Sequence, residues 1–215
     1  MMDELELLKR DWQKKDKQLP QLSFDDIYKM IWKKSSSIVK WIFLISIIEF
    51  LVPHLLYFLP SMSKNLAVWK DLGLGNFLLI SNVLQYTVVL YFIFQFYRRY
   101  REISTLDNAK KLLSNILKTR KTVKYYVIFC LSLIFMSFIV MAVGIYLNED
   151  PMVAMGYNYQ PENISPEKLK TILISTVVVL GIVVTLVMGC IYFLLYGILL
   201  KKLKKNYKEL KEMDI

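Results

Sequence analysis

The chain has 215 residues, of which 55% are hydrophobic and 21% are charged, with a net charge of +10 and a mean hydropathy of +0.39. This composition excludes a disordered chain, a fibrous repeat and a small disulfide-bonded scaffold. The charged residues are gathered in blocks that separate long apolar runs. The sequence therefore indicates an integral membrane protein.

A polar arm precedes the first apolar run, with eight basic and seven acidic residues among residues 1–37. Two short amphipathic helices are predicted in it. Ser23 suits the N-cap of the second, because Asp25 and Asp26 follow in its first turn. This helix is expected to lie on the membrane or to run into the first span. The candidate surface for a protein partner consists of the apolar side chains of both helices: Leu5, Leu8, Trp12, Ile27, Met30 and Ile31. The alternative is a solvated tail whose helices lie at the interface.

Four apolar runs are long enough to cross a bilayer, which takes about 20 residues. They are residues 38–59, 76–97, 122–147 and 171–200. Each is predicted to be helical, because lipid offers no hydrogen-bond partner to the backbone. The expected fold is all-α: a membrane four-helix bundle with amphipathic helices on the cytoplasmic side.

The distribution of Lys and Arg predicts the orientation. Residues 1–40, 98–124 and 201–215 hold 24 of them, whereas residues 60–75 and 148–170 hold four. The positive-inside rule then places both termini and the central loop in the cytoplasm, with the basic residues facing an anionic inner leaflet. The bacterial inner membrane is the expected location. The basic residues flank the spans, which argues against a nucleic-acid partner.

Two cytoplasmic segments have helical patterns of their own. An amphipathic helix is predicted at about 105–118, lying along the inner leaflet or under the bundle. The tail 201–215 contains neither Gly nor Pro, so one helix from Pro166 to about Met213 is expected. A short coiled coil of this tail with a second copy, or with the N-terminal arm, is an open alternative. Small residues in the fourth span recur at spacings that allow close helix packing: Gly181, Thr185, Gly189 and Gly197.

Glu49 is the one acidic residue within a span, near the bilayer midplane by residue count. Pro53 leaves the carbonyl of Glu49 without its usual helical donor. Asn82, Gln85 and Ser137 are expected at a similar depth, so the five residues form a predicted buried polar layer. Three interpretations remain open: hydrogen bonding between helices, a proton or cation site, and recognition of a lipid or small ligand. On the first, Glu49 is protonated and donates to Gln85, Asn82 or a freed carbonyl.

Known catalytic patterns are missing from the sequence, which contains no phosphate-binding loop, HExxH or GxSxG. Cys130 and Cys190 lie in apolar runs and His54 is the one histidine, so no zinc-ligand cluster exists. We therefore predict a protein that is not an enzyme and uses no metal or cofactor.

The sequence resembles uncharacterised four-span inner-membrane proteins of bacteria, and its N-terminal arm is similar to those of membrane-bound anti-sigma regulators. The resemblance rests on about forty residues: Asp3-Glu4-Leu5-Glu6-Leu7-Leu8 with Trp12, Leu22-Ser23, Ile27-Tyr28-Lys29-Met30-Ile31, and Lys34-Ser35-Ser36-Ser37-Ile38-Val39-Lys40-Trp41. It implies a cytoplasmic arm that holds a regulatory partner at the membrane. The His and Cys ligands of the zinc-bearing class are missing, and the resemblance transfers no functional residue.

Two classes of function follow from these patterns. The favoured one is a non-enzymatic scaffold or regulator whose cytoplasmic helices bind a protein partner or a second copy of the chain. The alternative is a small transporter, channel or accessory subunit that uses the layer around Glu49. Transporters often contain internal repeats, but Glu49, Pro53 and the Asn82/Gln85 face have no counterparts in the second pair of spans.

Overall fold

The structure, a computed structural model, describes residues 6, 9, 23–56, 67–104, 109–156 and 164–213, without the side chains of His54 and Leu56. Leu5, Leu8 and Trp12 of the predicted arm lie outside these residues. The helices are α2 (Phe24–Leu56), α4 (Gly75–Ser104), α5 (Ala109–Leu147), the short α6 (Pro151–Ala154), α7 (Pro166–Tyr192), the π-helical η1 (Phe193–Gly197) and α8 (Ile198–Glu212).

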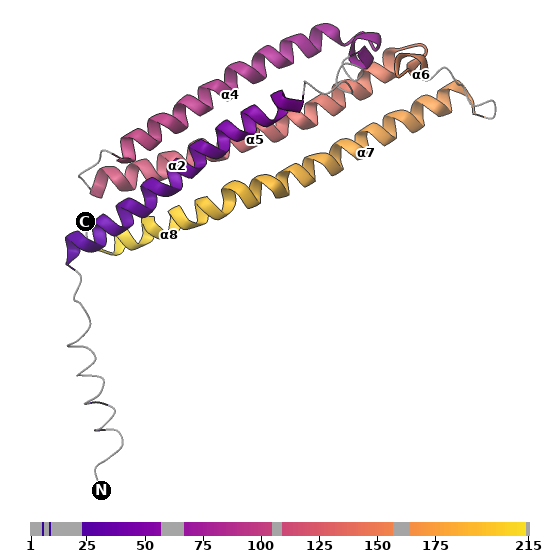
Figure 1. Cartoon of the computed structure of the whole chain (residues 1–215). Helices are drawn as coiled ribbons and strands as arrows, with labels where there is room; N and C mark the ends of the chain where they lie inside the picture. The colour runs from indigo at the N-terminus through magenta and orange to yellow at the C-terminus, as the bar shows by residue number, and fades with distance from the viewer. Residues whose placement is uncertain are drawn as a thin grey trace.

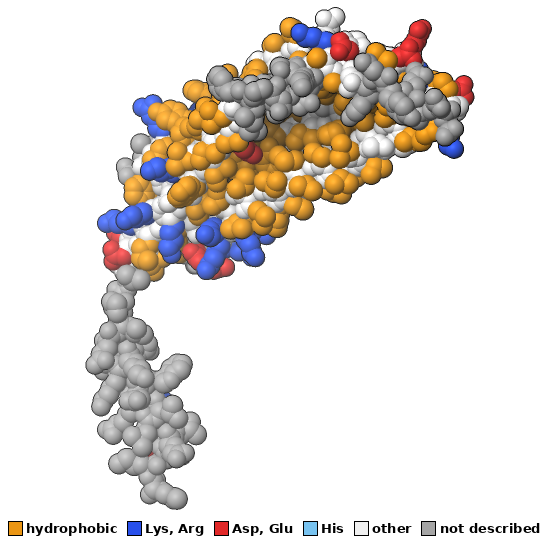
Figure 2. All heavy atoms as spheres, turned by 45° about the vertical axis from the view of Figure 1, so that its right-hand side comes forward, with side chains coloured by type: hydrophobic (Ala, Val, Ile, Leu, Met, Phe, Trp, Pro, Cys, Tyr) orange, Lys and Arg blue, Asp and Glu red, His pale blue; other side chains and the backbone are white. Residues whose placement is uncertain are grey.

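Four helices are long and apolar enough to cross a membrane: Phe24–Pro53, Gly75–Ser104, Ala109–Leu147 and Pro166–Glu212. They pack side by side along one long axis, and α6 lies at the end far from α8 (Figure 1). Hydrophobic side chains cover the middle of the face seen in Figure 2, and Lys and Arg gather mainly toward one end. These features confirm an all-α fold and indicate an integral membrane protein.

The N-terminal end of α2 is capped as the sequence predicted. The Ser23 hydroxyl accepts a hydrogen bond from the Asp26 backbone N–H at 3.2 Å and donates one to the Asp26 carboxylate at 2.7 Å. From Phe24 the helix runs without a break through the serines at 35–37 into the first apolar run. Of the two placements expected for this helix, the structure has the one in which it runs into the span.

The amphipathic helix predicted at about 105–118 is not a separate element. Its described part is the beginning of α5, which continues unbroken into the third apolar run. Of the two placements expected for it, along the inner leaflet or under the bundle, the structure favours packing against the other helices, because Leu112 and Ile116 are buried in the main core. The segment is continuous with the span because a single buried stripe, spaced by three or four residues, crosses the expected boundary: Leu112, Asn115, Ile116, Thr119, Val123 and Tyr126.

The C-terminal part of the fourth helix packs within the same chain. The segment Pro166–Glu212 is continuous, as predicted, but its middle turn η1 is π-helical. Beyond η1, α8 packs against α2 and α5, and the buried Asn206 amide donates to the Ser35 hydroxyl at 2.9 Å. The apolar face of the tail is thus covered by the N-terminal part of α2 and by α5.

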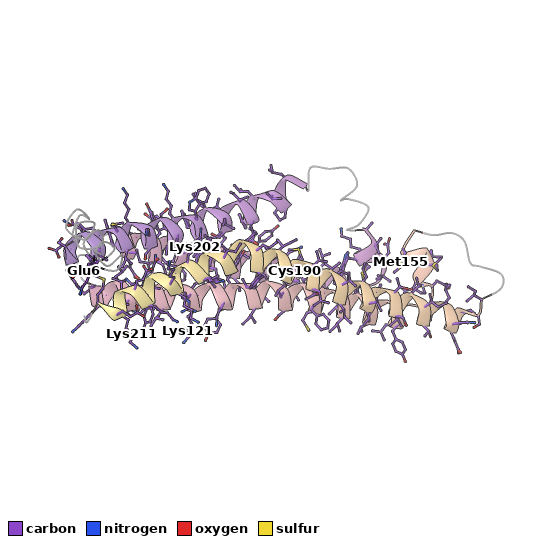
Figure 3. All side chains as sticks on the ribbon, turned by 90° about the horizontal axis from the view of Figure 1, so that it is seen from below. Glu6, Lys121, Met155, Cys190, Lys202 and Lys211 are labelled. Carbon is purple, nitrogen blue, oxygen red and sulfur yellow. The ribbon has the colours of Figure 1, made fainter. Side chains whose placement is uncertain are left out.

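The bundle has two regions that contrast in packing. The basic end comprises residues 24–37, 98–104, 109–124 and 201–213, and the apolar segments comprise residues 38–56, 76–97, 125–147 and 171–200. Lys121, Lys202 and Lys211 lie toward one end of the molecule and Met155 toward the other (Figure 3). The main core extends into the basic end, where Ile31, Ile103 and Leu203 are buried. The Trp32 indole N–H also joins α2 to α4 there, by donating to the Ile103 carbonyl at 2.7 Å.

Candidate functional site

A pocket of about 260 Å³ lies between the four long helices. Its described wall comes from α2, α4, α5 and α7: Glu49, Phe50, Pro53, Asn82, Gln85, Tyr86, Val89, Tyr126, Phe129, Cys130, Leu133, Ile134, Met188 and Tyr192. Glu49 is the one Asp or Glu of this wall, and none of its described residues is Lys, Arg or His. The pocket therefore offers a carboxylate in apolar surroundings.

Two tyrosine hydroxyls hold the Glu49 carboxylate. Tyr126 and Tyr196 both donate to its Oε2 atom, at 2.9 Å and 2.7 Å. The side chains come from α2, α5 and η1, so this one oxygen links three elements. Both tyrosines are almost completely buried, so their hydroxyls need a partner inside the bundle. The carboxylate satisfies that need.

Aromatic packing fixes where these hydroxyls point. The Tyr126 ring meets Phe96 edge to face at a centroid distance of 5.6 Å, and it meets Tyr196 in the same way at 5.9 Å. Tyr192 stacks on Tyr196 at 6.1 Å with an interplanar angle of 22°. Such contacts add to the burial of the rings and restrict their rotation. The donors that face Glu49 are thus held in place by their neighbours.

The π-helical turn supplies one of the two donors. Tyr192 ends α7 and Tyr196 lies within η1, and both are buried. Gly197 suits this turn, because a Cβ atom there would approach the Phe193 ring of the same helix to 3.0 Å. Single π-helical turns occur frequently at functional sites, and nothing in the apolar sequence of this run marked the position of this one.

The structure brings together most of the predicted polar layer. Glu49, Pro53, Asn82 and Gln85 line the pocket, and Pro53 lies inside α2. Ser137 is missing from the wall; its hydroxyl donates at 2.9 Å to the Leu133 carbonyl of its own helix. Helical geometry explains the difference, because a serine in lipid can satisfy its hydroxyl on the preceding turn without a second helix.

The observed hydrogen-bond partners of Glu49 are not those predicted on the first interpretation. Gln85, Asn82 or a freed carbonyl was expected to accept a hydrogen bond from Glu49, whereas Tyr126 and Tyr196 donate hydrogen bonds to its carboxylate. Tyr126 is 2% exposed, and its hydroxyl reaches Glu49 inside the bundle. Its spacing of three from Val123 on the buried stripe of α5 is the signal that places it inside.

The predicted small-residue row contributes unequally to helix packing. A Cβ atom at Gly181 would lie 2.6 Å from Phe138 Cβ of α5, so glycine permits this close approach. At Gly189 the nearest such contact, to Leu131, would be an ordinary 3.9 Å. Thr185 donates to the Gly181 carbonyl within the helix. The nearest neighbour of a Cβ atom at Gly197 would be the Phe193 ring of the same helix, so Gly197 does not mark a contact with another helix. Gly181 therefore stands out in this row as a point of close contact with α5.

The predicted partner-binding side chains of α2 separate onto different faces. Ile31 is 3% exposed and belongs to the main core, so it is not available to a partner. Ile27 and Met30 are exposed. The described residues contain no group of three or more His, Cys, Asp or Glu side chains placed to hold a metal ion.

Residues 25–215 match one known family. The match includes every described residue that lines the Glu49 pocket, and it includes all of α2 except Phe24. The chain belongs to the family described as Domain of unknown function (DUF8845). The candidate partner-binding residues Leu5, Leu8 and Trp12 lie outside the matched region. Comparisons with curated proteins and with solved structures found no match.

Proposed function

We propose that this chain is a small membrane protein that binds a small organic cation in the pocket around Glu49. One observation carries the proposal: a carboxylate lies in a pocket between four apolar helices, and no described side chain of the wall supplies a positive charge. A buried carboxylate without a counterion is costly, and two hydroxyl donors offset only part of that cost. A bound cation supplies the missing charge.

The rest of the wall suits an ammonium group. Cations are attracted to the faces of aromatic rings by about 0.5–2 kcal/mol. The wall contains five such rings: Phe50, Tyr86, Tyr126, Phe129 and Tyr192. The side-chain carbonyls of Asn82 and Gln85 add hydrogen-bond acceptors for an N–H group. A volume of about 260 Å³ limits the ligand to a small molecule.

The proposed role is that of a small transporter, channel or accessory subunit. A polar cavity within a span bundle is where transport substrates and coupling ions bind. We place both ends of the chain and residues 98–124 in the cytoplasm, because 24 of the 28 Lys and Arg residues lie in those segments. The protein is proposed to have no enzymatic activity and to need no cofactor.

Binding and transport can be tested with tetramethylammonium. Full-length protein in neutral detergent should be thermally stabilised by this cation, and Glu49→Gln should weaken its apparent affinity at least tenfold, because the amide carries no charge. Glu209→Gln is the matched control, since Glu209 is an acidic residue of α8 outside the pocket. Proteoliposomes should show a tetramethylammonium flux that Glu49→Gln abolishes. Equal stabilisation of both variants would refute a cation site at Glu49.

Orientation has a separate test. Reporter fusions after Lys64 and Gln160 are expected to read outside the cytoplasm, and fusions after Asn108 and Ile215 inside. A cytoplasmic signal at Gln160 would overturn the proposed topology without bearing on the pocket.

A regulator that holds a protein partner is the second candidate, favoured by the exposed Ile27 and Met30 at the start of α2. On this proposal the arm before Ser23 continues the partner surface, as the similarity to anti-sigma regulators implies. Deleting residues 1–22 leaves the Ser23 cap and the buried Ile31 intact. The shortened protein should fold normally and lose its partner in a pull-down; an unchanged recovery would exclude the arm as the docking segment.

A further inference from the structure

A second pocket, of about 280 Å³, opens where the end of α4 lies beside the start of α5. Its wall is strongly basic: Arg98, Arg99, Glu102, Lys111, Ser114, Asn115 and Lys118. We propose that this pocket binds a phosphate group, with Arg99 as the central donor. The proposal is independent of the Glu49 pocket, with which it shares no residue.

The charges of this wall favour an anion. Four basic side chains face one carboxylate, which leaves an excess of positive charge. Glu102 pairs with Arg98 at 2.9 Å and with Arg99 at 2.7 Å. One carboxylate shared by two guanidinium groups orients them without neutralising both. Among the described residues, neither Lys111 nor Lys118 forms an ion pair, so both remain available to a ligand.

Arg99 has a donor that nothing in the described structure satisfies. Its Nη1 atom is used by Glu102, but its Nε atom is buried and has no hydrogen-bond partner. The side chain is 15% exposed, so water has little access to it. A buried donor without an acceptor is rare in native proteins and costs free energy. A phosphate oxygen in the pocket supplies the acceptor, and the Arg fork suits the spacing of phosphate oxygens.

The position of the pocket points to the source of the phosphate. Arg98 directly follows Tyr97, the last residue of the apolar run 76–97, so the pocket begins where phospholipid headgroups lie. Ser114 and Asn115 also line the pocket and add neutral hydrogen-bonding groups. A phospholipid headgroup can enter from the membrane side, and a soluble phosphate has the same chemistry.

A second basic groove of the molecule provides a contrast. Lys33, Lys34, Lys202 and Lys205 line a wider space of about 530 Å³ between α2 and α8. None of the described residues of this wall is an arginine, and Asn206 already donates to Ser35. Lysine ammonium groups attract anions as point charges and lack the planar fork. Phosphate binding is therefore expected at the arginine pocket, with the lysine groove adding general attraction only.

Native mass spectrometry of the full-length protein in neutral detergent tests the proposal, with phosphatidylglycerol at stepped concentrations in one arm and inorganic phosphate in the other. One phosphatidylglycerol should bind ahead of any others. Arg99→Gln should weaken that first binding step at least tenfold, because it removes the guanidinium charge together with the Nε donor. Arg101→Gln is the matched control: it removes the same charge from an exposed position of α4 outside the pocket, and its effect should stay within twofold.

The two arms identify the source of the phosphate. Binding of phosphatidylglycerol alone assigns the pocket to a lipid headgroup, and binding of inorganic phosphate with the same dependence on Arg99 assigns it to a soluble phosphate compound. Arg99→Lys should recover less than half of the loss, since it restores the charge and not the fork. Equal weakening by Arg99→Gln and Arg101→Gln would overturn the proposal, because it would show attraction by surface charge alone. Thermal unfolding of each variant verifies that it is folded.

Discussion

The basic end and the apolar segments of the same helices are packed in different ways. In the basic end, α8 buries Leu203, Asn206 and Leu210 within 15 residues. In the apolar segments, α7 is 27 residues long and buries only Gly181 and Tyr192. Many large apolar side chains of the apolar segments are exposed, Leu186 and Phe193 among them. One continuous helix thus changes its packing along its length.

The solvent expected around each region explains this difference. Water drives apolar side chains of the basic end into a core, because their burial contributes about 25 cal/mol per Å². Lipid tails are as apolar as leucine, so leaving Leu186 on the surface costs little there. Helices in lipid associate through close packing and hydrogen bonds instead. The contact of Gly181 with Phe138 and the two tyrosine hydrogen bonds to Glu49 are contacts of these kinds.

The largest expected effect contrasts the same substitution in the two regions. Leu203→Ala should lower the free energy of unfolding by about 2–5 kcal/mol, because Leu203 is fully buried and its loss leaves a cavity. Leu186→Ala should change it by less than about 0.5 kcal/mol, because Leu186 is 65% exposed. Unfolding midpoints of the full-length protein in detergent measure both. Similar losses for the two variants would contradict the contrast between the regions.

Two glycines of α7 sharpen the comparison within the apolar segments. Gly181→Ala should destabilise the protein by about 1–3 kcal/mol relative to Gly189→Ala. Its new methyl would lie 2.6 Å from Phe138 Cβ, whereas the methyl at residue 189 would meet Leu131 at 3.9 Å. Both changes gain the same helix propensity, so the difference isolates the steric contact. Equal stabilities would mean that α7 can move away from α5 at little cost.

Removing a single hydroxyl tests the hydrogen bonds to Glu49. Tyr196→Phe should cost about 0.6–2 kcal/mol, since it deletes the 2.7 Å bond and leaves the buried ring in place. Tyr146→Phe, at a residue that is 70% exposed, is the control and should be neutral. Unfolding in mixed micelles is a suitable measurement. A neutral Tyr196→Phe would show that the Tyr126 hydroxyl alone suffices.

The smallest net effect is expected from the buried polar pair of the basic end. Ser35→Ala alone should cost about 1–3 kcal/mol, because the Asn206 amide is left without its 2.9 Å acceptor. The double variant Ser35→Ala, Asn206→Leu should return to within about 1 kcal/mol of the native protein, because apolar replacements of both partners remove the unsatisfied group. A double variant that stays as unstable as the single one would show that the pair is required for packing.

The sequence predicted the helices better than their contacts. The apolar runs, the Ser23 cap and the continuity of Pro166–Glu212 all depend on local chemistry and were found as expected. The prediction of a separate helix at about 105–118 was wrong, because the buried stripe of that segment continues through Val123 and Tyr126 into the third span. Asn82 and Gln85 were placed correctly beside Glu49 by depth. For Ser137, depth in the membrane gave a wrong prediction of its partners: its hydroxyl donates to a carbonyl of its own helix and not into the pocket.

The sequence by itself determined that four helices form and where each is apolar, because hydrogen bonding within a helix and the length of an apolar run are local properties. Only the tertiary structure decided which groups meet Glu49. Tyr126 and Tyr196 lie 77 and 147 residues away from it, and their orientation depends on how four helices are rotated about their axes. The π-helical turn adds a change of rotation that the residue pattern did not reveal. Helix rotation is set by side-chain packing between segments distant in sequence. The same packing therefore decides which groups surround the Glu49 carboxylate.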